Sequence, residues 1–281
     1  MRADSTTPPS ILIAPESRDR RVDLRELWQH RGLLVLLAGR DLRVRYKQAV
    51  FGAGWAVMQP FTTMVLFSVL FHRMGRFPAT GNVPYPVLAF CGLVPWTFFA
   101  NALGQASLSL VANPELVTKV YFPRELIPMA PVITAAVDFC VAFVVLLGMM
   151  LWFHVEVPAS AFAVAPLLVF VALTVMALSL WSSALTLLYR DLRFIVPFLI
   201  QIGFMVTPVI WETGKLVPER WHLVAALNPM ATAIDGFRWA MLGSAPVRLS
   251  DIVVSVAVTA ALLAMGHRFF RRTERSFADR I

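Results

Sequence analysis

The sequence predicts an all-α integral membrane protein with six transmembrane helices. Of its 281 residues, 58% are hydrophobic and 15% are charged, and the mean hydropathy is +0.69. A soluble globule exposes more charge than this, so the excess apolar surface is expected to face lipid. Six apolar stretches approach the roughly 20 residues that a helix needs to cross a bilayer. These stretches are residues 49–71, 85–108, 132–153, 164–188, 194–211 and 252–270.

The chain begins with a polar segment, residues 1–22, which contains TTPPS and ESRDRR. It lacks the apolar core of a signal peptide, and we expect a disordered cytosolic tail. Apolar residues then recur at a spacing near 3.6 over residues 23–39, which predicts an amphipathic helix in the inner interface of the membrane. A simple lead-in to the first span is the alternative. We expect residues 23–270 to form one transmembrane domain and residues 271–281 a cytosolic tail.

The first span follows a cluster of cations and is interrupted by two residues that suit lipid poorly. The cations are Arg40, Arg43, Arg45 and Lys47. Gln59 is costly against lipid, and Pro60 removes one backbone hydrogen bond and kinks a helix. We therefore expect the cluster to mark the inner end of this span, and the span to face the interior of the bundle.

The distribution of cations predicts the topology. Six spans put both termini on the same side, and cytosolic loops carry the excess of Lys and Arg. With cytosolic termini, 19 of the 25 Lys and Arg residues lie inside. The net charge of +8 is then explained by topology and by attraction to anionic lipid, and no nucleic-acid partner is expected.

The cytosolic loop after the second span reads NPELVTKVYFPRELIP, residues 113–128. Asn113 can cap a helix, Pro114 fits its first turn, and Glu115 complements the helix dipole. A short charged helix over residues 114–120 is more than a connector needs, and it offers a rigid contact for a soluble partner. An interfacial turn is the alternative.

The longest external segment, residues 211–251, contains WHLVAALNPMATAIDGFRWAMLG. This stretch is too apolar for a loop in water, and Asn228 and Pro229 interrupt it. We expect two short helices that enter the outer half of the membrane, which is possible only where protein or a cavity surrounds them.

Asp138 is the one acid deep in a predicted span. A proton relay needs further acids or histidines at that depth, so we expect hydrogen bonds to Ser, Thr or Gln of a neighbouring helix. The sequence lacks phosphate-loop, zinc-protease and serine-hydrolase motifs, and its two cysteines lack metal-type spacing. We therefore expect no catalytic residues, no metal and no cofactor on this chain, which predicts a conduit or an anchor.

Five stretches in order carry a family resemblance. They are RDLRVRYKQAVFGAGWAVMQP, VPYPVLAFCGLVPWTFF, NPELVTKVYFPRELIP, LYRDLRFIVPFLIQIGFMVTPVIW and LNPMATAIDGFRWAML. Each resembles the corresponding part of the membrane (permease) subunit of type-2 ABC exporters that move polysaccharides, the class that exports O-antigen, teichoic acid and galactan. The resemblance covers about residues 23–270.

This resemblance implies a homodimer in the bacterial cytoplasmic (inner) membrane, bound to two copies of a separate ABC ATPase. ATP and Mg would bind the ATPase, and an undecaprenyl-linked glycan would pass between the two membrane subunits. Residues 213–248 would form external gate helices, and the helix at 114–120 would be the coupling helix. The expected coupling residues are Pro114, Glu115, Leu116, Thr118, Lys119, Tyr121, Phe122, Arg124 and Glu125.

A path for glycans suits aromatic side chains, because sugar C–H faces stack on them weakly. The candidate path residues are Gln59, Tyr85, Trp96, Phe98, Phe99, Phe204 and Trp211. For each aromatic residue, a place in the interfacial belt or against lipid is the alternative. The cluster Arg40, Arg43, Arg45 and Lys47 is the candidate site for the pyrophosphate of the lipid carrier.

Three other functions stay open on the sequence alone. An exporter of a small drug or a lipid would share the family. A secondary transporter is disfavoured by the single intramembrane acid and the lack of an internal repeat. A membrane-embedded enzyme that modifies glycans is disfavoured because polar residues do not cluster at one membrane depth.

Overall fold

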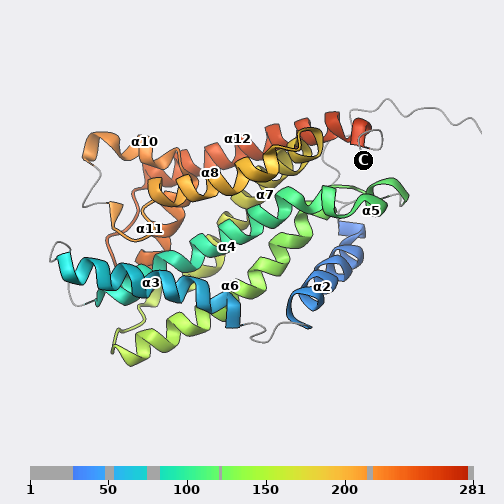
Figure 1. Ribbon diagram of the computed structural model, residues 1–281. Coiled ribbons are helices and arrows are strands. Elements are labelled where there is room, and N and C mark those ends of the chain that lie inside the picture. The colour runs from blue at the N-terminus through green and yellow to red at the C-terminus, as the bar shows by residue number, and fades with distance from the viewer. Residues whose placement is uncertain (1–27, 48–53, 75–82, 120–121, 214–217, 278–281) are drawn as a thin grey trace, which may run out of the picture.

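The structure is a computed structural model that describes residues 28–47, 54–74, 83–119, 122–213 and 218–277. Every regular element in these ranges is a helix, as predicted. The helices form an elongated bundle (Figure 1). The predicted tail at residues 1–22 and the candidate residue Tyr121 lie outside the described residues.

Among the described residues, four helices are long and apolar enough to cross a membrane. They are α4 (Tyr85–Ala112), α6 (Leu126–Trp152), α7 (Val164–Leu188) and α12 (Leu249–Thr273). They correspond to the second, third, fourth and sixth predicted spans. A short 3₁₀ turn, η1 (Ala159–Ala163), precedes α7, and another, η3 (Glu274–Ser276), follows α12.

The first and fifth predicted spans are shorter helices. Helix α3 covers Gly54–Met74, and α8 covers Leu192–Val206. The 15 residues of α8 extend about 22 Å at 1.5 Å per residue, less than the roughly 30 Å of a hydrocarbon core. The total of six spans therefore stays a prediction.

The predicted end of the fifth span, at Trp211, is wrong. Helix α8 ends at Val206, and Thr207 is extended with φ −86° and ψ 140°. The cause is local, because a proline disfavours the helical conformation in the residue before it, and Pro208 follows Thr207.

Helix α4 occupies the centre of the bundle, between α3, α6, α7, α8 and α11 (Pro229–Leu242) (Figure 1). Its side chains from Val87 to Phe99 are all buried. A helix that is apolar around its whole circumference is expected to be buried on all sides, and α4 fits that rule.

Helices α7 and α12 pack closely because a small residue faces a large one. A Cβ atom added to Gly266 would lie 2.8 Å from the Trp181 ring, so only glycine fits there. The Trp181 indole stacks on Phe269 with ring centroids 4.8 Å apart, and its Nε1 donates to the Leu262 carbonyl at 3.3 Å. Small residues and interhelical hydrogen bonds are what join helices in lipid.

The predicted interfacial helix ends later than expected. Helix α2 runs from Arg31 to Lys47 and not to residue 39, and it packs along α6 (Figure 1). Leu37 and Ala38 are buried against Ala130. The basic cluster is therefore part of this helix and does not form the first turn of the first span.

Within the described part of residues 211–251 lie two short α-helices. They are α10 (His222–Ala226), which follows the 3₁₀ turn η2 (Glu219–Trp221), and α11. Asn228 caps α11 by accepting from the Met230 N–H at 3.1 Å, and Gly243 ends it in the left-handed conformation with φ 64°, which glycine adopts without strain. These helices lie at one end of the bundle. The short helix α5 (Pro114–Lys119) and the C-terminal end of α12 lie at the other (Figure 1).

Candidate functional site

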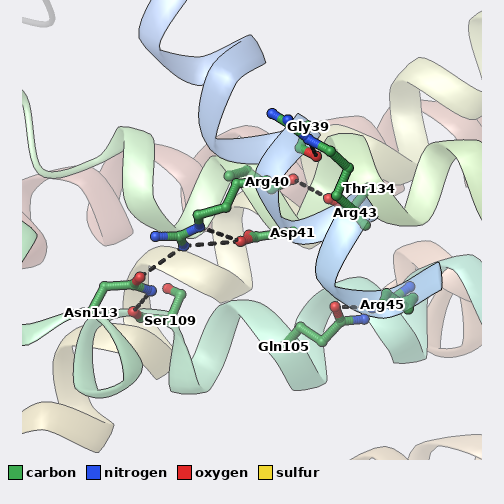
Figure 2. A network of polar contacts seen from close by, with 10 residues as sticks. Gly39, Arg40, Asp41, Arg43, Arg45, Gln105, Ser109, Asn113 and Thr134 are labelled. Carbon is green, nitrogen blue, oxygen red and sulfur yellow. Dashed lines mark hydrogen bonds and ion pairs between the residues drawn. The ribbon is translucent and has the colours of Figure 1, made fainter. Parts of the chain in front are cut away.

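A network of polar contacts joins α2 to α4 and α6 (Figure 2). Arg40 donates to Asp41 at 2.9 Å and to the Asn113 amide oxygen at 2.8 Å. Arg45 forms an ion pair with Asp138 of α6 and donates to Gln105 of α4. The helix that carries the basic cluster is thereby fixed to the bundle at two points.

The expectation for Asp138 is wrong. Its partners are Arg45 and the Tyr46 hydroxyl group, and neither is the Ser, Thr or Gln that we expected. The reason is that α2 continues to Lys47, which brings two polar side chains against α6. A carboxylate that is 9% exposed needs such a counter-charge, because an unpaired buried charge is strongly unfavourable.

Tyr46 is held in its neutral form. Burial, its hydrogen bond to Asp138 and the charge of Asp138 together raise its pKa to about 12. The hydroxyl group therefore stays protonated near neutral pH and donates to the carboxylate. Asp138 therefore receives two donors, Arg45 and Tyr46.

The predicted capping role of Asn113 is also wrong. Its amide nitrogen donates to the Ser109 carbonyl at 2.8 Å, and its amide oxygen accepts from Arg40. Neither group bonds the start of α5. Asn113 instead connects α2 to the junction between α4 and α5.

The four cations of the basic cluster differ in their surroundings. Arg40 and Arg45 make the protein contacts described above. Arg43 is exposed and donates to the Gly39 carbonyl of its own helix at 3.2 Å, and Lys47 is exposed. Arg43 and Lys47 are therefore the members whose charge is most open to a ligand.

Helix α5 presents its charged residues outward. Pro114, Glu115, Thr118 and Lys119 are exposed, and Leu116 is half-buried. Glu115 and Lys119 form an i,i+4 pair at 3.1 Å, and Val117 on the other face is buried. The helix thus has one outer face suited to a polar contact and one inner face that fixes it to the bundle.

The remaining described coupling candidates point into this chain. Phe122 and Glu125 are 8% and 3% exposed. Arg124 is half-buried and donates to the Glu274 carbonyl at 2.7 Å. These three residues hold the segment between α5 and α6 against α12.

Several candidate path residues meet where α3, α4 and α8 come together. Trp96 lies 5.3 Å from Phe99 and 5.8 Å from Phe204 between ring centroids. Phe67 of α3 lies 6.2 Å from Phe204. Trp96 and Phe99 are buried within the chain, while Gln59 is exposed on α3.

The other candidate path residues lie elsewhere. Phe98 is 2% exposed and packs edge-on against Phe139 at 5.9 Å, on the side of α4 that faces α6. The Tyr85 hydroxyl group donates to the Ile210 carbonyl at 3.2 Å. Trp211 is half-buried, and its carbonyl oxygen accepts from Arg238.

Sequence reasoning missed the role of Arg238. Its guanidinium is 1% exposed and donates to the carbonyl oxygens of Pro208 at 2.9 Å and Val209 at 2.6 Å, and to that of Trp211. It therefore satisfies the backbone of the extended segment after α8, which a membrane interior would otherwise leave unpaired. The available signal is a charged residue within the apolar stretch IDGFRWAML.

Gly92 lets this extended segment approach α4. A Cβ atom at Gly92 would collide with the Val209 carbonyl oxygen and would lie 2.7 Å from Nη2 of Arg238. The close contact between α4, α11 and the segment after α8 therefore requires glycine at this position.

An apolar cavity of about 320 Å³ lies between α7, α11 and α12. Its lining includes Leu167, Phe170, Trp239 and Val256, with the Thr232 hydroxyl group among the few polar atoms.

Comparison with known proteins defines the class. The family model for the ABC-2 type transporter matches residues 32–242, and this chain belongs to that family. It is similar to an O-antigen export system permease protein, RfbA, from Myxococcus xanthus, with 29% identity that covers 92% of this chain and 98% of the relative. It is also similar to RfbA of Klebsiella pneumoniae, with 26% identity over 88% of this chain and 94% of the relative.

Proposed function

We propose that this chain is the membrane-spanning subunit of an ATP-driven exporter that moves a lipid-linked polysaccharide across the bacterial inner membrane. The observation that carries the proposal is the likeness, over nearly the full length, to relatives named as O-antigen export permeases. All five stretches that carry the resemblance lie within the residues that the family model matches. The long apolar helices are consistent with a protein that transports its substrate across a membrane.

The proposed energy source is a separate ABC ATPase that binds ATP and Mg, while this chain binds no cofactor. Two copies of the ATPase would contact two copies of α5. Two features of α5 support this role. Its outer face exposes the pair Glu115 and Lys119, which an ATPase can contact. Its inner face buries Val117, which fixes the helix to the bundle so that a movement of α5 reaches the other helices.

We further propose a homodimer whose glycan path lies between the two copies. Helices α3 and α8 carry many large apolar side chains that one copy leaves exposed. These include Trp55, Phe61 and Leu66 on α3, and Phe194, Phe198 and Met205 on α8. Gln59 is also exposed on α3, where its amide group can form hydrogen bonds with a sugar.

The lipid carrier would enter from the inner leaflet near α2. Arg43 and Lys47 are the preferred contacts for its pyrophosphate, because both are exposed, whereas Arg40 and Arg45 are engaged by protein groups. Cytosolic termini and six spans complete the proposed arrangement, with α10 and α11 as the external gate.

The pairing of Asp138 argues against a secondary transporter. A proton-carrying acid must gain and lose its proton during the cycle. Asp138 is paired with Arg45 and also accepts from Tyr46, so these contacts give it a structural role in joining α2 to α6.

The proposal is tested by deleting the gene for this chain in its host. Surface polysaccharide should disappear and lipid-linked glycan should accumulate on the cytosolic side, and the wild-type chain should reverse both changes. Unchanged surface polysaccharide in the deletion strain would contradict the proposal.

A further inference from the structure

A second cluster of charges lies at the end of the bundle that holds α5, around Glu125. Glu125, at the start of α6, has its Oε1 atom 2.9 Å from Nε of Arg271 and 3.0 Å from Nδ1 of His267. Arg271 also lies 3.7 Å from the Glu274 carboxylate. We call Arg124, Glu125, His267, Arg271 and Glu274 the Glu125 cluster.

The Glu125 cluster connects two segments that are distant in sequence. The side chain of Glu125 is 3% exposed, so the Arg271 guanidinium and the His267 ring largely replace water around its charge. Arg124 adds a second link through the Glu274 carbonyl. The segment that follows α5 is therefore fixed to the last turns of α12 and to η3.

Apolar contacts continue this connection to α5 itself. Val117, on the inner face of α5, belongs to one buried cluster with Phe122, Phe270 and Phe277. Phe270 and Phe277 meet edge-on at 5.3 Å between ring centroids. A displacement of α5 therefore cannot occur without moving these rings or breaking the contact, because closely packed interfaces do not deform continuously.

We propose that Glu125 is a positioning residue that links α5 to the cytosolic end of α12, so that movement of α5 by the ATPase is passed to the last span. This inference rests on the proposed function and adds α12 as the element that receives the motion. Glu125 acts within the chain and does not contact the ATPase.

The test uses the full complex of this chain with its ATPase in membrane vesicles. The variants are Glu125→Gln, which removes the charge and keeps the shape, and Arg271→Gln, with Arg271→Lys as the conservative change. Glu156→Gln is the matched control, because Glu156 is an exposed carboxylate outside the cluster. The two readouts are ATP hydrolysis and glycan exported per ATP.

Glu125→Gln and Arg271→Gln should assemble and hydrolyse ATP, while glycan exported per ATP falls by about fivefold or more, the lower range for coupling between distant sites. Arg271→Lys should retain most of the coupling, and Glu156→Gln all of it. If Glu125→Gln fails to accumulate, Arg124→Gln gives the same test at a half-buried position.

Equal export per ATP in the wild type and in these variants would overturn the inference. So would a loss of export that matches the loss of assembled complex, since that is the effect of instability alone. Failure of the wild-type complex to move any glycan would instead contradict the proposed function.

Discussion

Arg45 of α2 forms an ion pair with Asp138, which lies half-way along α6. This pair joins α2, a helix that carries five cations, to the bundle. The Arg45 side chain is 28% exposed and the Asp138 side chain is 9% exposed. The carboxylate is therefore almost fully buried, while the guanidinium is partly accessible.

Removing only the acid should destabilise the protein. Asp138→Ala leaves Arg45 without its counter-charge, and we expect a loss of about 2–3 kcal/mol, below the cost for a fully buried pair because Arg45 is partly exposed. The double variant Arg45→Met, Asp138→Leu should recover part of this loss. Thermal unfolding of the purified protein measures both, and equal losses in the single and double variants would contradict the pairing.

A methyl group at Gly92 should disrupt the end of the bundle that holds α11. Gly92→Ala places an atom against the Val209 carbonyl and Arg238, and overpacking of this kind costs about 1–3 kcal/mol. The matched control is Gly148→Ala, since no atom lies within 4 Å of a Cβ there. The control should change stability by about 1 kcal/mol at most. Similar unfolding midpoints for the two variants would refute the close approach.

Reversing both charges on α5 should release the ATPase. Glu115 and Lys119 are exposed, and single surface charges are each worth only about 0–1 kcal/mol. Glu115→Lys combined with Lys119→Glu keeps an ion pair within the helix but exchanges the positions of the positive and negative charges that the ATPase contacts. Co-purification of the ATPase measures the effect, and a double variant that still binds it and exports normally would rule out docking at α5.

The exposed Gln59 gives a cleaner test of the glycan path than the buried aromatic residues. Trp96→Ala would leave a cavity and cost about 3–5 kcal/mol, so its effect on export could not be separated from unfolding. Gln59→Leu should instead slow export without changing the amount of complex, and Gln59→Asn should be close to the wild type. Surface glycan at equal complex levels is the measurement, and normal export by Gln59→Leu would place the path elsewhere.

Some elements could be predicted because their signals are local. The structure has α7 at Val164–Leu188, the range expected from the apolar run, and α4 begins at Tyr85 directly after Pro84. The Asn-Pro break before α11 was also visible, because both residues favour the start of a helix.

Other features could not be predicted because they depend on contacts between distant segments. A basic cluster normally marks the end of an apolar span, yet α2 continues through it because Arg45 finds Asp138 and Gln105 on other helices. Arg238 likewise has its role only once α11 lies beside the segment after α8. Periodicity along one segment contains no information about such partners.

The most direct test of the central claim is transport by the purified complex. This chain and its ATPase would be reconstituted in liposomes with an O-antigen-type glycan linked to its polyprenyl carrier, and a glycosidase added outside would report how much glycan has crossed. The account predicts that glycan becomes protected only when ATP is hydrolysed. Hydrolysis without protection of the glycan, together with movement of a labelled phospholipid or a small drug, would contradict the account.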